Sequence, residues 1–236
     1  MKAFSEKHPI IFEIILFVVG LLLAAVVAGV LNAFGCNNEV SASIARILIG
    51  IAFLAVFHRN FSFGNSFKGF ALMLPALLLA IYKIPYHFIS GGGAPNAITV
   101  PVLLIGLAPA VFEEVLFRGI FISNLKRKYN SPTAIVLISA IVFSLVHLTN
   151  MGGMSTISLL LQLIMALVVG IVLGAIYLYT EDIVSVIVAH FAVDVLGGIF
   201  CGGETTPFYF FAILAALFVF ETVYGLLIVR KIAADK

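Results

Sequence analysis

The stretch Ala110-Val-Phe-Glu-Glu-Val-Leu-Phe-Arg-Gly119 places three ionisable side chains, Glu113, Glu114 and Arg118, inside an otherwise apolar segment. The residues on either side of it, 101–109 and 120–122, are apolar as well. An unpaired ion at bilayer depth costs from about 2.5 kcal/mol to more than about 10 kcal/mol, so such a cluster persists only where it faces a protein interior or a watery cavity. The stretch therefore predicts a membrane-embedded helix whose charged groups meet partners on other helices.

The composition of the whole chain agrees with that interpretation. Of its 236 residues, 63% are hydrophobic and only 10% are charged, and the mean hydropathy is +1.22. A soluble domain carries about 25% charged residues. We therefore expect an all-α polytopic membrane protein, with residues 1–236 forming a single membrane domain in the lipid bilayer of the cell membrane. No basic patch is interleaved with aromatic residues, so nucleic acid is not expected as a partner. Two cysteines, Cys36 and Cys201, are too few for a disulfide scaffold or a thiolate metal site; they can pair, although two free thiols are favoured.

The apolar runs and the positions of the basic residues predict the topology. Eight spanning helices are expected, over residues 9–34, 40–58, 68–85, 100–125, 132–149, 156–180, 183–200 and 207–229. If the N-terminus is inside, ten Lys and Arg residues fall on the inner side and only Arg46 and Lys83 on the outer side. Because cytoplasmic loops carry an excess of Lys and Arg, both termini are predicted to be cytoplasmic.

The three charged residues of the opening stretch are expected to play different parts. Glu114 and Arg118 are at positions i and i+4, with the acid first, which favours a helical ion pair. Glu113 points about 100° away around the helix and has no local partner. A buried structural triad of all three groups is the alternative. Gly106 and Gly119 on the same helix allow close approach of neighbouring helices.

Two other predicted helices carry titratable groups at bilayer depth. His147 ends the run Phe143-Ser-Leu-Val-His147, and His190-Phe-Ala-Val-Asp194 places an imidazole and a carboxyl on one helix face. Each can be a satisfied structural group, but one polar cavity shared by the fourth, fifth and seventh helices is simpler. His147 lies about 22 Å from the inner end of its helix and His190 about 10 Å, so helix tilt, or a fifth helix that starts below the lipid boundary, must bring them together.

These residue types suit hydrolysis by an activated water. A carboxylate such as Glu113 can take a proton from water and return it to a leaving amine. Two imidazoles can hold that water, donate to an oxyanion, or ligate Zn²⁺ together with Glu113. The chain has neither a Ser–His–Asp arrangement nor a Gly-x-Ser-x-Gly elbow, so a covalent nucleophile is not supported. From the residues alone, a peptidase and a proton-coupled transporter both remain open.

The three motifs, Glu113-Glu114-x-x-x-Arg118, Phe143-x-x-x-His147 and His190-x-x-x-Asp194, resemble those of the CPBP family. This is the CAAX prenyl endopeptidase and bacteriocin-processing family, also called Abi, and the resemblance covers a core of about residues 100–200. It implies an intramembrane endopeptidase in which Glu113 activates water that His147 helps to hold, while His190 and its partner Asp194 stabilise the oxyanion. Family members are commonly labelled metalloproteases, and a metal-free mechanism is also argued for them. The resemblance thus implies either Zn²⁺ held through Glu113, His147 and His190, or no cofactor.

One position departs from the prenyl-protease branch of that family, which has Asn where this chain has Asp194. An ionised Asp accepts hydrogen bonds and cannot donate one to an oxyanion. The difference weakens the expectation of a prenylated substrate. Bacterial relatives are linked to peptide maturation and to self-immunity against bacteriocins, so we expect a peptide or protein substrate in one of those roles. A non-enzymatic membrane immunity or binding protein is the alternative.

Overall fold

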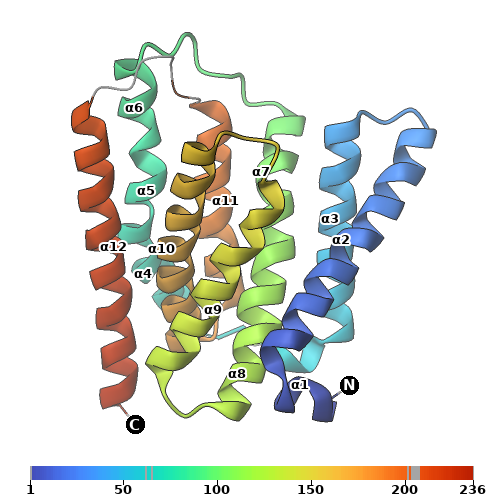
Figure 1. Ribbon diagram of the computed structural model, residues 1–236, viewed down its shortest axis with the longest axis vertical. Coiled ribbons are helices and arrows are strands. Elements are labelled where there is room, and N and C mark those ends of the chain that lie inside the picture. Colours follow the sequence, from blue (N-terminus) through green and yellow to red (C-terminus); the bar gives the residue numbers. More distant parts are fainter. Residues whose placement is uncertain (1, 62, 65, 201, 203–207, 236) are drawn as a thin grey trace.

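The computed structural model describes residues 2–61, 63–64, 66–200, 202 and 208–235, and it is a bundle of helices that run roughly along one axis (Figure 1). The predicted all-α class is confirmed. In the described residues the extended contacts amount to one isolated bridge, between Phe63 and Asp182. The elements in chain order are α1 (Lys2–Lys7), α2 (Pro9–Ala33), α3 (Asn38–Val56), the 3₁₀ turn η1 (His58–Asn60), α4 (Ser66–Ala76), α5 (Leu78–Ile81), α6 (Lys83–Ile89), α7 (Val100–Glu114), the π-helical segment η2 (Val115–Phe121), α8 (Ile122–Lys128), α9 (Pro132–Val146), the 3₁₀ turn η3 (His147–Asn150), α10 (Thr156–Thr180), α11 (Ile183–Ile199) and α12 (Phe208–Ala234).

The expected number of eight spans is not reproduced in full. Among the described residues, six helical segments are long and apolar enough to cross a membrane, and α4 with α5–α6 makes a seventh if this pair, bent by 42°, is one span. Pro75 lies just before the break, where a proline removes a helical hydrogen bond and clashes with the preceding turn. The remaining predicted span corresponds to α11, which is apolar but only 17 residues long.

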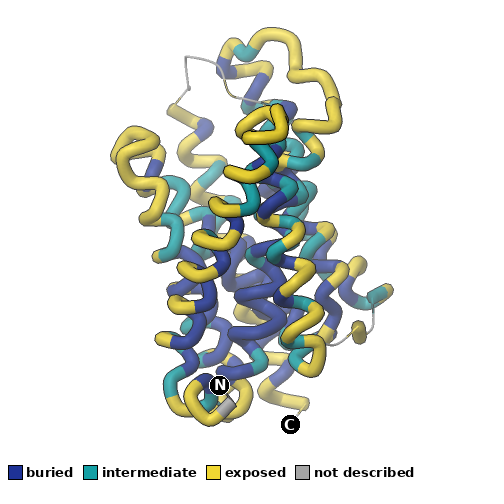
Figure 2. The backbone as a smooth tube through the Cα atoms, turned by 90° about the vertical axis from the view of Figure 1, so that its right-hand side faces the viewer, coloured by how far each residue is buried: buried dark blue, intermediate teal, exposed yellow. Residues whose placement is uncertain are grey.

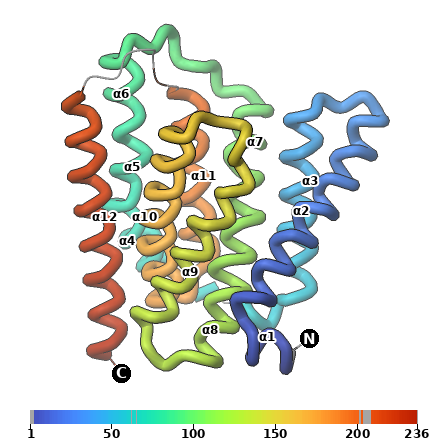
Figure 3. Tube along the Cα trace, viewed as in Figure 1, coloured from blue at the N-terminus to red at the C-terminus, as the bar shows by residue number. Residues whose placement is uncertain are grey.

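One continuous element, α7–η2–α8, forms the centre of the molecule. It packs against α2 and α3 on one side and against α9, α10 and α11 on the other. All seven residues of η2 are buried. Figure 3 shows the pair α2–α3 standing apart from the group α9–α12, with α7 between them. The predicted charged stretch therefore lies where the two parts of the bundle meet.

Burial is not uniform along the bundle. Buried residues gather in the half of the molecule that is nearer to the two termini, whereas the other end is largely exposed (Figure 2). Both chain ends lie at that same well-packed end (Figure 1). Its assignment to the cytoplasm stays a prediction. Cys36, in the α2–α3 turn at the opposite end, is exposed, and Cys201 lies outside the described residues.

The start of α11 is fixed to its neighbours by one carboxylate. The backbone N–H of Ser185 donates to Asp182 Oδ2 at 3.0 Å, which caps the helix. The other oxygen of Asp182 accepts from the Ser66 hydroxyl at 2.9 Å. Asp182 thus ties the beginning of α4 to the beginning of α11, the helix that carries two of the predicted site residues.

Candidate active site

Glu114 is the point at which the central helix and α11 meet. Its side chain is fully buried, and Oε1 lies 3.0 Å from Arg118 NH1 and 2.7 Å from His190 Nδ1. Because a carboxylate only accepts, His190 donates from Nδ1. From the sequence, Glu114 was expected to pair with Arg118 alone, and its contact with His190 was not expected. A carboxylate has about four acceptor sites, more than one arginine fills, so a second partner for Glu114 could have been expected from the sequence.

Arg118 is held more by charge and stacking than by directed hydrogen bonds. Its contact with Glu114 lacks hydrogen-bond geometry, and none of its three side-chain nitrogens has a hydrogen-bond partner in the part of the chain that the structure describes. Its guanidinium lies over the Phe143 ring at 4.3 Å. A planar guanidinium suits such a cation–π contact in a desolvated place.

His190 lies between two carboxylates. While Nδ1 contacts Glu114, Nε2 lies 3.4 Å from Asp194 Oδ2, one helical turn further along α11. This arrangement suits an imidazole that carries hydrogens on both nitrogens. Asp194 is partly exposed, whereas Glu114 is fully buried, so Asp194 is the partner that solvent or substrate can displace.

His147 begins the 3₁₀ turn at the end of α9, and its ring orientation is fixed by the backbone. Nδ1 lies 2.8 Å from the carbonyl oxygen of Phe143. A carbonyl only accepts, so Nδ1 carries the hydrogen, and Nε2 of the neutral ring is left as an acceptor. His147 can therefore take a hydrogen bond from a water molecule through Nε2.

The structure brings the two histidines to one place. Their rings contact the same Phe143 ring, with centroid distances of 5.1 Å for His147 and 6.1 Å for His190. The difference in depth that the sequence predicts is closed by the inclination of α9, which starts lower than α11 in Figure 1 and runs obliquely across the bundle.

A cavity of about 350 Å³ opens beside this cluster, between α9, α10, α11 and α12. His147, His190 and Asp194 supply polar groups to its wall. Most of the other residues that line it are apolar: Phe143, Met154, Leu161, Met165, Ala166, Val169, Val193, Leu214 and Phe218. A largely apolar cavity with a few convergent polar groups is the usual form of a binding or active site.

Glu113 lies beside the cavity and is not among the residues that line it. The side chain is partly exposed, yet Oε2 is buried and has no hydrogen-bond partner among the described residues. Electrostatic interactions connect Glu113 with His190, His147, Asp194 and Glu114. The structure thus brings all six predicted site residues together. Oε2 of both Glu113 and Glu114 is buried without a hydrogen-bond partner among the described residues, but Glu114 uses Oε1 on Arg118 and His190, whereas Glu113 makes no ion pair with a described residue.

The arrangement does not fit a metal centre. In the described part of the chain, no group of three or more His, Cys, Asp and Glu side chains is placed so that it could hold a metal ion. Glu113, His147 and His190, the expected Zn²⁺ ligands, therefore do not form such a group.

Comparison with known proteins agrees with the resemblance. Residues 95–196 match the family model described as type II CAAX prenyl endopeptidase Rce1-like. The match covers all three motifs and the helices that carry them. Searches of curated proteins and of solved structures gave no match. Residues 95–196, which hold the site, are therefore similar to the type II CAAX prenyl endopeptidase Rce1-like family.

Proposed function

We propose that this protein is an intramembrane endopeptidase that hydrolyses a peptide bond with a water molecule activated by Glu113. The observation that carries the proposal is the buried Glu113 Oε2, which has no hydrogen-bond partner among the described residues and lies beside a cavity containing His147 and His190. A buried acceptor without a partner is costly, and such groups are expected where a ligand or water completes them.

The cavity suits a peptide with apolar side chains. Its volume of about 350 Å³ lies within the range of about 300–1,000 Å³ that is typical of small-molecule sites. Met154, Leu161, Leu214 and Phe218 offer apolar contact area, while the polar groups gather on the side of His147 and His190. An extended peptide could place side chains against the apolar wall and a carbonyl group near the imidazoles.

The first step is the attack of water. His147 Nε2 accepts a hydrogen bond from the water and orients it, and the Glu113 carboxylate takes the proton as the water oxygen bonds to the peptide carbonyl carbon. The electron pair of the carbonyl bond moves to the oxygen. His190, which the carboxylates of Glu114 and Asp194 hold at its two nitrogens, donates from Nε2 to that oxyanion in place of Asp194.

The second step breaks the carbon–nitrogen bond. Glu113 returns its proton to the leaving nitrogen, the electron pair of the oxyanion reforms the carbonyl, and an amine and a carboxylic acid are released. Glu114 Oε1, which also contacts Arg118, holds His190 in place, and Glu114 takes no part in the proton transfers. No step uses a metal ion.

We further propose that the substrate is a peptide or protein in the cell membrane, and that the role is peptide processing or bacteriocin self-immunity. The short loops between the helices and the Asp at position 194 support this role, rather than one in which the substrate must carry a prenyl group. Because the matching family is named for CAAX prenyl endopeptidases, cleavage of a prenylated CAAX peptide is the comparison for cleavage of an unprenylated peptide.

Cleavage by the purified protein in liposomes tests the proposal. The substrates are a library of quenched fluorescent peptides that includes prenylated and unprenylated CAAX sequences. Glu113→Gln is expected to lower kcat/KM by about 10²–10⁴-fold, and His190→Ala by about 10²–10³-fold. His147→Ala is expected to abolish most of the activity because the water loses its acceptor. The chelator EDTA is expected to leave the rate unchanged.

Glu13→Gln is the matched control, since Glu13 is a fully buried acid on α2 and does not line the cavity. It should cleave at the wild-type rate. Full activity in Glu113→Gln would contradict the mechanism. A wild-type protein that cleaves no peptide of the library would favour a non-enzymatic immunity or transport role.

A further inference from the structure

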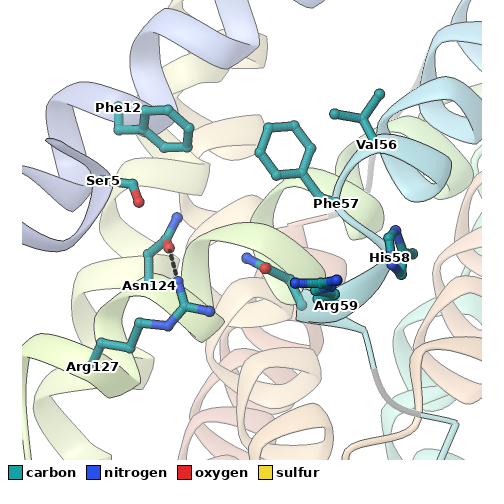
Figure 4. A pocket seen from close by; sticks show the side chains of 9 residues that line it. Ser5, Phe12, Val56, Phe57, His58, Arg59, Asn124 and Arg127 are labelled. Carbon is teal, nitrogen blue, oxygen red and sulfur yellow. Dashed lines mark hydrogen bonds between the residues drawn. The ribbon is translucent and has the colours of Figure 1, made fainter. Parts of the chain in front are cut away.

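A second cavity, of about 430 Å³, lies at the end of the molecule that carries both termini. It is formed by α1, the start of α2, the end of α3 with η1, and α8 (Figure 4). One part of its wall is apolar, from Phe12, Val56 and Phe57, and another is polar, from Arg59, Asn124 and Arg127. It shares no lining residue with the cavity beside His147 and His190.

Asn124 supplies a buried donor to this cavity. Only 1% of the residue is exposed, and its Oδ1 accepts a hydrogen bond from Arg127 NH1 at 3.1 Å. Its Nδ2 is buried and has no hydrogen-bond partner among the described residues. Figure 4 shows the Asn124 side chain between Ser5 and Arg127, with the nitrogen pointing away from Arg127. An amide N–H left without an acceptor at the wall of a cavity indicates that a ligand supplies the acceptor.

The positive charges beside Asn124 have no acidic partner in the part of the chain that the structure describes. Arg127 bonds to the neutral amide of Asn124, and Arg59 has no ion-pair partner in the described residues. None of the described residues that line this cavity is acidic. Glu181 lines a neighbouring cavity that shares Arg59 and Arg127, but it is paired with Lys126. The donors therefore face the cavity without a protein anion.

The turn that carries Arg59 is anchored to the central helix at two points. The Ser123 hydroxyl donates to the carbonyl oxygen of Asn60 at 2.8 Å. The Phe61 ring occupies the space over Gly119, where an added Cβ would lie 1.9 Å from Phe61 Cε1. The position of Arg59 relative to Asn124 and Arg127 is thus set by the fold.

We propose that this cavity binds the phosphate-bearing headgroup of an anionic phospholipid. Guanidinium and amide N–H groups match the acceptor oxygens of a phosphate, and Phe12, Val56 and Phe57 offer a surface for the adjoining acyl chains. The cavity lies at the end of the spanning helices, on the side where the basic residues gather, which is where basic pockets between helices hold anionic headgroups. A free phosphate would satisfy the same donors but would leave the apolar wall unused.

Native mass spectrometry of the full-length protein in detergent tests this proposal. The probes are phosphatidylglycerol, phosphatidylcholine with the same acyl chains, glycerol 3-phosphate and inorganic phosphate. The wild-type protein should retain phosphatidylglycerol in preference to the other three. Neutralising one arginine, Arg59→Gln or Arg127→Gln, should weaken retention by about fivefold, and the double variant by more than about tenfold.

Arg230→Gln is the matched control, because Arg230 is an exposed arginine on α12 at the same end of the molecule and does not line the cavity. It should bind phosphatidylglycerol as the wild type does. Asn124→Asp, which replaces the unpartnered donor by an acceptor of the same size, should also weaken retention. Equal losses in Arg230→Gln and Arg59→Gln would overturn the site in favour of general surface charge. Inorganic phosphate binding as tightly as the lipid would overturn the assignment to a lipid.

Discussion

Glu113 and Glu114 are adjacent in the chain, yet the structure gives them opposite surroundings. Glu114 is fully buried; its Oε1 contacts both Arg118 and His190, while its Oε2 has no hydrogen-bond partner among the described residues. Glu113 is partly exposed, and its buried Oε2 has no hydrogen-bond partner among the described residues. One residue of helix turns a side chain by about 100°, which is enough to pack one acid into the structure of the site and to leave the other for the proposed chemistry.

Because of this difference, we expect substitution of Glu114 to lower the stability of the protein and substitution of Glu113 to lower its activity. Glu114→Gln leaves the Arg118 guanidinium buried without its counter-charge, and breaking a buried pair from one side costs about 3–5 kcal/mol. Glu113→Gln removes no such pair and should leave the free energy of unfolding close to the wild-type value while abolishing cleavage. Unfolding followed by circular dichroism in mixed detergent measures the first effect. Equal unfolding free energies for the two variants would contradict the assignment.

At this scale, some of the site could be predicted from the sequence because its contacts are local. The i, i+4 spacing is sufficient to expect that Glu114 and Arg118 meet, and that His190 and Asp194 share a helix face. The contact between Glu114 and His190 joins residues 76 apart, and its formation depends on how α7 packs against α11. Helical periodicity within either segment does not contain that information.

The central helix lies close to the residues predicted for it, but its backbone departs from regular α-helical geometry. A single span over 100–125 was expected, and the structure has α7, with Pro109 inside it, followed by η2 and α8 over residues 100–128. The departure from α-helical geometry lies at Val115–Phe121, after the proline and immediately after Glu114. Such π-helical turns are often found at functional sites. All seven residues of this turn are buried, so tertiary packing decides its geometry, and sequence pattern does not reveal it.

Two glycines on the central helix have the role that the sequence predicts, namely the close approach of neighbouring chain segments. An added Cβ at Gly106 would lie 2.6 Å from Val195 Cγ2 and 3.1 Å from the Val195 backbone nitrogen, on α11. At Gly119 the neighbour is Phe61. Gly106 thus sets the distance between the helix that carries Glu114 and the helix that carries His190.

Gly106→Ala is therefore expected to push α7 away from α11 and to reduce cleavage. Overpacking of this kind costs about 1–3 kcal/mol, and a shift of about 1 Å in a catalytic group costs about 100-fold in rate. The measurement is kcat/KM on a cleaved peptide together with the unfolding free energy. Gly29→Ala is the control, because nothing lies within 4 Å of an added Cβ there. Similar behaviour of the two variants would show that the approach of α7 to α11 does not control the site.

For the molecule as a whole, composition was enough to predict the class and the approximate positions of the helices. It was not enough to predict their continuity. The expected span over 68–85 is broken into α4, α5 and α6 with a bend of 42°, although Pro75 was a visible signal. The expected span over 183–200 ends as a 17-residue helix. Hydropathy measures how apolar a segment is, whereas bends and helix ends depend on the neighbours against which it packs.

The two ends of the bundle are expected to differ in their accessibility from outside the cell. Both chain ends and the cavity with Arg59 and Arg127 lie at one end, and exposed Cys36 lies at the other (Figure 1). Because basic residues favour the cytoplasmic side, a membrane-impermeant maleimide should label Cys36 in intact cells that express the Cys201→Ser variant. A cysteine at exposed Ala234, introduced without Cys36 and Cys201, should react only after permeabilisation. The reverse pattern would invert the orientation, and labelling of both in intact cells would contradict the placement of the two positions on opposite sides of the membrane.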